Sequence, residues 1–368
     1  MSYLELGIEI IKTIESNGYK AYLIGGVVRD YLLSMPINDV DITTNMPIDK
    51  LKEIFEIEDN GSDYASVTII KDDYRFEITH FRRDVKYLDH RHPIVELCDN
   101  LEDDVKRRDF TINAFAMDGN YNIIDYFNGL SDLKAKSIKT INDPMIRFDE
   151  DALRILRALY FSAKLNFEIE DNTLKAMIES RYLLCYLSNE RIYDYFIKIL
   201  YAKTNRGLEY IKKYHLFDYL RAFNDWLNIL NPSYNINDLA LYYYHEYNDF
   251  PPVISSKDKK RCWIFKEIIN SNFDNYTIYK YQDETKEFLD VFLNLEYDII
   301  DIKEKLNSLR IKNYKEWALS PSKIATMFKG EMITIAIREV VKAILNGTID
   351  NNEKSIIIFL QGLDVLKC

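Results

Sequence analysis

Cysteine, long apolar runs and positive charge are all scarce in this sequence. The four cysteines lie far apart in 368 residues and form no C-x-x-C pair, which argues against a zinc site or a disulfide framework and fits a reducing cytoplasm. No apolar run approaches membrane-span length, and the acidic, amphipathic N-terminus is unlike a signal peptide, so we expect a cytoplasmic protein without membrane association. The net charge of −11 argues against a general nucleic-acid binder, which is normally basic.

The chain does have enough apolar material for large cores, with 47% hydrophobic residues. Its length favours two or three domains. Charge varies along the chain: residues 151–221 contain 12 Lys and Arg against 9 Asp and Glu, whereas residues 231–300 contain 7 against 12. The middle of the chain is therefore the better candidate for contact with an RNA backbone.

The stretch 21–44, AYLIGGVVRDYLLSMPINDVDITT, predicts a strand, a turn, a helix and a second strand. Gly25 and Gly26 follow the first strand and allow a tight turn with close approach of a ligand. The helix that opens after them directs its free N–H groups toward the glycines, which favours anion binding. Arg29, one helical turn on, adds a cation with a forked set of donors.

Two carboxylates occupy the second strand of this stretch. Asp39 and Asp41 are two residues apart, so at strand periodicity they leave the same face. Beside a phosphate-binding turn, such a pair suits Mg²⁺ bound to a triphosphate. A second D-x-D, at Asp149 and Asp151, falls in a helical pattern, where a two-residue step of about 200° separates the carboxylates.

A third motif, EDALRILRALYFSAKL, covers 150–165 and predicts one helix. Asp151, Arg154 and Arg157 recur every three residues and so share a face, which on its own is equally compatible with a salt-bridged helix surface. There is also a chemical interpretation. A carboxylate accepts from the exocyclic amine of C or A, and a guanidinium donates to the adjacent ring nitrogen. U and G present the opposite pattern and would face unpaired groups.

These motifs, with RRDFTINA at 107–114, resemble the class II tRNA nucleotidyltransferases, the CCA-adding enzymes, and their CC-adding, A-adding and bacterial poly(A) polymerase relatives. The resemblance implies an α+β protein: a small nucleotidyltransferase head with a mixed β-sheet at 1–140, followed by an all-helical neck, body and tail. Residues 141–222 would form the helical neck and body that select the nucleotide. Residues 223–368 would form the helical body and tail that bind tRNA.

The resemblance also assigns roles to the motif residues. Asp39 and Asp41 would be the catalytic metal ligands, and Mg²⁺ the cofactor. Arg108 would contact phosphate or ribose, and Asp109 and Asn113 would hold the sugar. The complete set of expected nucleotide-binding residues is Gly26, Arg29, Arg108, Asp109, Asn113, Asp151, Arg154 and Arg157. Two positions stay open: Glu77 as a third acidic group, and Tyr160, where the family commonly has an arginine.

Residues 82–94, RRDVKYLDHRHPI, are charged and aperiodic, so we expect a mobile loop. The segment resembles a flexible loop of the family that helps the site switch from C to A. CC-adding relatives typically lack that loop. His90 and His92 are not expected to bind a metal, because no other Cys or His lies near them. The resemblance to the loop rests on Asp84, Tyr87, Asp89, Arg91 and Pro93.

The function predicted from the sequence is template-independent addition of C and A to the tRNA 3′ end, from CTP and ATP, by two-metal catalysis. An enzyme that adds only the terminal A, and a poly(A) polymerase with the same head, remain alternatives. A pseudoenzyme that only binds RNA is a further alternative, against which the intact pair Asp39 and Asp41 argues. The remaining local patterns predict helices at 3–17, 48–57 and 101–106, a connecting helix or turn at 129–139, strands at 66–70, 75–80 and 122–125, and only helices beyond 165.

Overall fold

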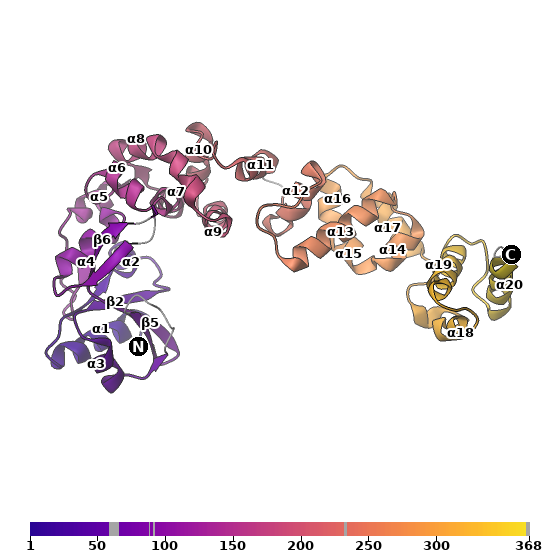
Figure 1. Cartoon of the computed structure of the whole chain (residues 1–368), viewed down its shortest axis with the longest axis horizontal. Helices are drawn as coiled ribbons and strands as arrows, with labels where there is room; N and C mark the ends of the chain where they lie inside the picture. The colour runs from indigo at the N-terminus through magenta and orange to yellow at the C-terminus, as the bar shows by residue number, and fades with distance from the viewer. Residues whose placement is uncertain (59–65, 88, 91–92, 232–233, 366–368) are drawn as a thin grey trace. The chain divides into compact units, whose positions relative to one another are not determined.

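The computed structural model describes residues 1–58, 66–87, 89–90, 93–231 and 234–365. The chain forms two compact units, Met1–Arg221 and Ala222–Cys368. In Figure 1 the first unit runs from indigo to magenta and contains every strand found among the described residues. The expected α+β class, with a mixed sheet in the head and a mainly helical remainder, is confirmed.

The first unit is built on a seven-stranded sheet with the order β3-β4-β5-β2-β1-β8-β9. Only β2 and β5 pair in parallel; the other neighbours in this sheet are antiparallel. Its strands are β1 (Ala21–Ile24), β2 (Val40–Thr44), β3 (Ile57–Glu58), β4 (Ser66–Lys71), β5 (Tyr74–His80), β8 (Ala116–Met117) and β9 (Ile123–Ile124). Two further pairs of strands form small separate sheets, β6 (Arg82–Tyr87) with β7 (Pro93–Leu97) and β10 (Ser137–Ile138) with β11 (Glu168–Ile169).

Helices surround this sheet and continue after it. They are α1 (Tyr3–Ser16), α2 (Gly26–Leu32), α3 (Ile48–Ile54), α4 (Leu101–Lys106), the 3₁₀ helix η1 (Thr111–Asn113), α5 (Gly129–Ala135), α6 (Pro144–Glu150), α7 (Leu153–Leu165), α8 (Asp171–Glu179), η2 (Arg181–Tyr186), α9 (Asn189–Leu200) and α10 (Arg206–Lys213). The expected helices at 3–17, 48–57 and 101–106 are thus confirmed within a few residues, and the segment 129–139, expected as a helix or a turn, forms helix α5 followed by strand β10. The expectation of only helices beyond 165 is wrong at β11, which pairs in parallel with β10.

The first helix shows how the sequence directs this packing. Ser2 and Glu5 form a reciprocal capping box that begins α1. Its apolar face, including Ile10 and Ile14, is fully buried. A Cβ at position 7 would lie 3.0 Å from a Val40 methyl carbon, so glycine lets the helix approach β2 closely.

The predicted strands at 66–70 and 75–80 form the β4–β5 hairpin. Asp72 and Asp73 occupy its turn with φ of 50° and 64°. Two consecutive residues with positive φ match the twist of the flanking strands, as in a type I′ turn. The hairpin brings β5 beside β2, the strand that begins directly after Asp39.

The expected mobile loop at 82–94 is corrected by the structure, because β6 and β7 pair there as an antiparallel hairpin. Its side chains are exposed or half-buried throughout, and Arg83 and Glu96 form a cross-strand ion pair of 2.8 Å. A ribbon without a buried face has no alternation of apolar residues, so sequence periodicity did not reveal it. Arg91 and His92 lie outside the described residues.

The single helix expected at 150–165 is also corrected. Helix α6 ends at Glu150, Asp151 is extended with φ of −146° and ψ of 102°, and α7 begins at Leu153. The Asp151 carboxylate accepts the Leu153 N–H at 3.0 Å, and the Ala152 N–H donates to the His90 carbonyl at 3.0 Å. These contacts replace the helical bonds at the break.

Among its described residues, the second unit contains helices and no strand. Its elements, beginning with the helix that starts at the unit boundary, are α11 (Arg221–Ile229), η3 (Ile236–Asp238), α12 (Leu239–Tyr247), α13 (Ser256–Asn270), α14 (Asn275–Lys280), α15 (Gln282–Glu287), α16 (Leu289–Asn294), α17 (Ile299–Ser308), η4 (Tyr314–Glu316), α18 (Pro321–Ala325), α19 (Glu331–Leu345) and α20 (Glu353–Val365). Phe265, Phe288 and Phe292 belong to its core. Across the described part of the chain, no helix combines the length and apolarity that a membrane crossing requires.

Candidate active site

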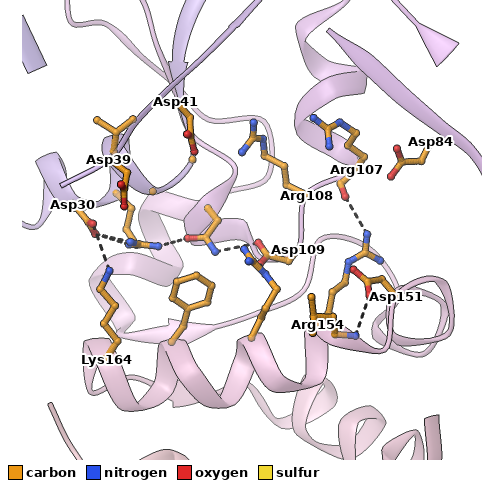
Figure 2. A pocket seen from close by; sticks show the side chains of 18 of the residues that line it. Asp30, Asp39, Asp41, Asp84, Arg107, Arg108, Asp109, Asp151, Arg154 and Lys164 are labelled. Carbon is orange, nitrogen blue, oxygen red and sulfur yellow. Dashed lines mark hydrogen bonds and ion pairs between the residues drawn. The ribbon is translucent and has the colours of Figure 1, made fainter. Parts of the chain in front are cut away.

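The ten residues predicted from the sequence line one pocket of about 570 Å³ in the first unit. Figure 2 looks into this pocket, whose wall residues come from the β1–α2 turn, β2 and the residues before it, the β6–β7 hairpin, the segment around Arg107–Asn113, and α7. The ten residues are Gly26, Arg29, Asp39, Asp41, Arg108, Asp109, Asn113, Asp151, Arg154 and Arg157. Their roles in binding and catalysis stay predictions.

The glycine turn and Arg29 form one wall of the pocket. Gly25 precedes α2 with φ of 78°, which a residue with a side chain rarely adopts. Arg29 is 2% exposed. Its Nε donates to Asp30 Oδ1 at 2.8 Å, and its Nη1 donates to Asn113 Oδ1. The guanidinium is therefore fixed at the wall before any ligand binds.

Asp39 and Asp41 bring negative charge to the same wall region. Val40, between them, points into the core, and Asp41 reaches the pocket. The Asp41 side chain is exposed to solvent, but much protein lies around its carboxyl group. The surrounding protein disfavours the charged form and raises the pKa of Asp41. Glu77 and Asp39 raise this pKa further, and Arg108 opposes the rise. Glu77 pairs with Asp41 in the β2–β5 register but is absent from the pocket lining.

The donor chemistry of this pair fits a hard divalent cation. Carboxylate oxygens are the preferred ligands of such ions, and burial together with the charges of Glu77 and Asp39 raises the pKa of Asp41. Within the described ranges, no group of three or more His, Cys, Asp or Glu could hold a metal ion.

Asp109 links the middle of the pocket to α7. Its Oδ1 accepts from the Phe110 N–H at 2.8 Å and from Asn113 Nδ2 at 3.0 Å, and its Oδ2 accepts from Arg157 Nε at 2.5 Å. Burial opposes ionisation of this carboxyl, but Arg157 and the hydrogen bonds from Asn113 and Arg157 outweigh it and lower the pKa of Asp109. Arg157 Nη1 also donates to the Tyr195 hydroxyl at 3.1 Å.

Arg154 is held from several sides at the other end of α7. Its Nη1 donates to the Arg147 carbonyl at 2.7 Å and to Glu150 Oε2 at 2.8 Å. Its Nη2 donates to the Tyr87 hydroxyl and to the Arg107 carbonyl, both at 3.1 Å. Arg154 is only 4% exposed, but it lines the pocket, as does Asp151 (Figure 2).

The β6–β7 hairpin contributes Asp84 and Tyr87 to this end. The Tyr87 hydroxyl donates to Asp84 Oδ2 at 2.5 Å. Burial raises the pKa of Tyr87 to about 12, and the hydrogen bond to Asp84 adds to the rise against the opposing charge of Arg154. Three of the residues on which the loop resemblance rests, Asp84, Tyr87 and Pro93, therefore line the pocket from strands β6 and β7. His90, at the hairpin tip, contacts the Asp149 carbonyl through Nδ1 at 2.8 Å.

Sequence reasoning missed Asp104, a fully buried carboxylate on α4. Its Oδ1 accepts from Arg107 Nη2 at 2.9 Å and from the Arg82 N–H at 3.2 Å, and its Oδ2 accepts from the Thr43 hydroxyl at 3.3 Å. Oδ2 also lies 3.7 Å from Arg108 Nη2. The signal was available, because an acid three and four residues before a pair of arginines on a helix is in ion-pair range.

Sequence reasoning also missed further pocket residues on α2 and α7, namely Asp30, Phe161 and Lys164. Phe161 and Lys164 follow Arg157 at four and seven residues, so continuing the same helical face would have identified them. Tyr160 does not line the pocket; its ring packs edge-on against Tyr195, with centroids 6.1 Å apart.

Two family models match parts of this chain. Residues 21–139 match a family model described as the poly A polymerase head domain. Residues 166–227 match one described as a probable RNA and SrmB-binding site of polymerase A. A head of the first kind defines a nucleotidyltransferase, and divalent metal ions are typical of the polymerase family.

Relatives and a solved structure extend the likeness to the whole chain. A CCA-adding enzyme of Bacillus licheniformis is 30% identical over 95% of this chain and 96% of its own length. One from Pediococcus pentosaceus is 43% identical over 59% of this chain and 55% of its own. The crystal structure of a Bacillus stearothermophilus CCA-adding enzyme in complex with CTP covers 100% of this chain and 99% of that one, with a TM-score of 0.75 and 25% identity. The chain belongs to the CCA-adding enzyme family.

Proposed function

We propose that this protein adds C and A to the 3′ end of tRNA from CTP and ATP without a template. One observation carries the proposal: a carboxylate pair suited to a metal, Asp39 and Asp41, and a pair suited to a base edge, Asp151 and Arg154, line the same pocket. The full-length likeness to CCA-adding enzymes, one of them in complex with CTP, supports it. The cysteine pattern supports a cytoplasmic location.

Asp39 and Asp41 are the proposed ligands of Mg²⁺, which prefers carboxylate and phosphate oxygens. When bound there, Mg²⁺ would lower the pKa of the primer 3′-hydroxyl and neutralise charge on the departing pyrophosphate. Gly26 allows the triphosphate to approach the backbone, and Arg29 and Arg108 bind it with fixed charge.

Asp109 and Asn113 hold the ribose in this proposal, and Arg157 fixes Asp109 through the 2.5 Å hydrogen bond. Asp151 accepts from the exocyclic amine that C and A share, and Arg154 donates to the ring nitrogen beside it. U and G would place a carbonyl oxygen against the Asp151 carboxylate and a ring N–H against the Arg154 guanidinium, and each of these mismatched contacts costs about 1–3 kcal/mol. This difference selects two of the four nucleotides.

The head is proposed to span 1–140, the nucleotide-selecting neck and body 141–222, and the tRNA-binding body and tail 223–368. The match of residues 166–227 to a probable RNA-binding site supports RNA contact by the middle region as well. Residues 166–227 also include most of the stretch 151–221, in which Lys and Arg outnumber Asp and Glu.

A primer-extension assay tests the proposed function. Purified protein receives Mg²⁺, CTP, ATP and tRNA transcripts that end before CCA, after C and after CC. We expect all three to be extended to one CCA end. Extension of only the CC-ended transcript would identify an A-adding enzyme, long A tails would identify a poly(A) polymerase, and no incorporation would identify an RNA-binding pseudoenzyme.

Gly25→Ala is expected to weaken nucleotide binding. The added Cβ would lie 2.7 Å from Arg108 Nη1, so the guanidinium has to move away from the triphosphate wall. We expect the KM for both nucleotides to rise by about ten- to a hundredfold. Gly18→Ala is the matched control, because Gly18 has φ of +84° and nothing within 4 Å of its added Cβ. Equal KM changes in the two variants would show that backbone strain, not displacement of Arg108, is the cause.

A further inference from the structure

Helix α7 extends along the pocket, and four of the residues that line it recur on one face of the helix. Arg154, Arg157, Phe161 and Lys164 all line the pocket, at spacings of three, four and three residues. These spacings keep them on one helical face. Ten residues of helix span about 15 Å, so Arg154 and Lys164 stand at opposite ends of the face. Figure 2 shows Lys164 directed toward Asp30 and Asp39, far from Arg154.

Lys164 has no role in the function proposed above, and its ion pair with Asp30 is long. Its Nζ lies 3.8 Å from Asp30 Oδ2, near the limit for an ion pair. Asp30 is already neutralised by Arg29, whose Nε and Nη2 lie 2.8 and 2.7 Å from Asp30 Oδ1. The Lys164 side chain is 31% exposed and half enclosed by the pocket. Burial lowers the pKa of Lys164, Arg29 lowers it further, and Asp30 and Asp39 oppose this.

We propose that Lys164 binds the phosphate chain of the incoming nucleoside triphosphate, and the pyrophosphate released from it, at the end of the pocket opposite Arg154. This inference rests on the proposed function and extends it to a residue outside the predicted site. A lysine ammonium is a mobile point charge that suits phosphate oxygens. The nucleotide would then lie along α7, with its base near Arg154 and its phosphates near Asp39 and Lys164.

This placement has a consequence that separates Lys164 from the base-reading residues. The phosphate chain is common to CTP and ATP, so loss of the Lys164 charge affects both nucleotides equally. Inorganic pyrophosphate and tripolyphosphate, which carry no base, depend on the same contact. A lysine that only balances Asp30 would influence none of these ligands directly.

The test compares Lys164→Met, Lys164→Arg and a control, Lys134→Met, at an exposed position of α5. We expect Lys164→Met to raise the KM for CTP and for ATP, and the Kd for tripolyphosphate, each by about tenfold. Lys164→Arg restores much of this binding, and Lys134→Met behaves as the original protein. Thermal unfolding of each variant shows whether the fold is kept.

Two readouts keep this inference separate from the proposed function. Tripolyphosphate binding by calorimetry needs no incorporation, so binding that depends on Lys164 in a protein without activity would reject the proposed function alone. Unchanged KM and Kd values in Lys164→Met would overturn the inference while leaving C and A addition intact. A KM change for only one of the two nucleotides would also overturn it, because phosphate contacts do not distinguish bases.

Discussion

Asp41→Asn is expected to abolish nucleotide incorporation without lowering stability. The carboxylate charge is the property that suits Asp41 to a metal ion, and a metal supplies several kcal/mol of transition-state stabilisation. The single-turnover rate should therefore fall by about a thousandfold or more. Since burial and the neighbouring carboxylates raise the pKa of Asp41, removing its charge also removes repulsion, and the melting temperature should stay equal or rise.

The same rate loss is expected for Asp39→Asn and for the double variant, because residues that act as a unit have non-additive effects. Asp49→Asn serves as the control, because Asp49 is an exposed acid on α3 outside the pocket. The rate is measured with Mg²⁺ and a CC-ended tRNA transcript, and stability by thermal unfolding. Retention of more than about a tenth of the rate in either single variant would remove that residue from the catalytic pair.

Asp104→Ala is expected to cost about 3–5 kcal/mol of unfolding free energy, the range found when one partner of a buried ion pair is removed. The carboxylate is fully buried and receives donors from β2, from Arg82 at the start of β6, and from Arg107. Its loss removes the negative charge that lies between the guanidiniums of Arg107 and Arg108. The two positive charges then repel each other without compensation. Asp104→Asn keeps the shape and one acceptor oxygen, so its loss should be smaller.

Urea denaturation checks this prediction, with far-UV circular dichroism as the signal. The three tryptophans, Trp226, Trp263 and Trp317, all lie in the second unit, so their fluorescence reports on that unit and serves as an internal reference. Glu102→Gln, an exposed acid on the same short helix, is the control. Equal destabilisation by Glu102→Gln and Asp104→Ala would mean that helix charge, not the buried contacts, stabilises this region.

The parts of the fold that the sequence predicted are those with a local, periodic signal. Strand β1 is a short apolar run, and the β4–β5 turn contains two aspartates that tolerate positive φ. Asp39 and Asp41 were placed on one face by strand periodicity alone. The grouping of all ten site residues in one pocket came from the family resemblance, because residues near 29, 108 and 154 approach each other only through tertiary packing.

The misses have physical causes. The β6–β7 hairpin lacks a buried face, so no alternation marked it. The helix break at Asp151 arises from tertiary contacts, including the Ala152 N–H bond to His90, that override a continuous helical pattern. Asp104 was not singled out within the helix predicted at 101–106, because burial of one carboxylate among its exposed neighbours cannot be derived from composition.

The four hydrogen bonds that hold Arg154 have a consequence for how selection is expressed. An arginine that must be ordered by its ligand loses about 2 kcal/mol of rotamer freedom on binding. Here the Arg147 and Arg107 carbonyls, Glu150 and Tyr87 have ordered the guanidinium already. In the proposed function, an incoming base would exchange one hydrogen-bond partner of Arg154 for another, and its discrimination would depend on matching donors to acceptors rather than on the entropy of a moving side chain.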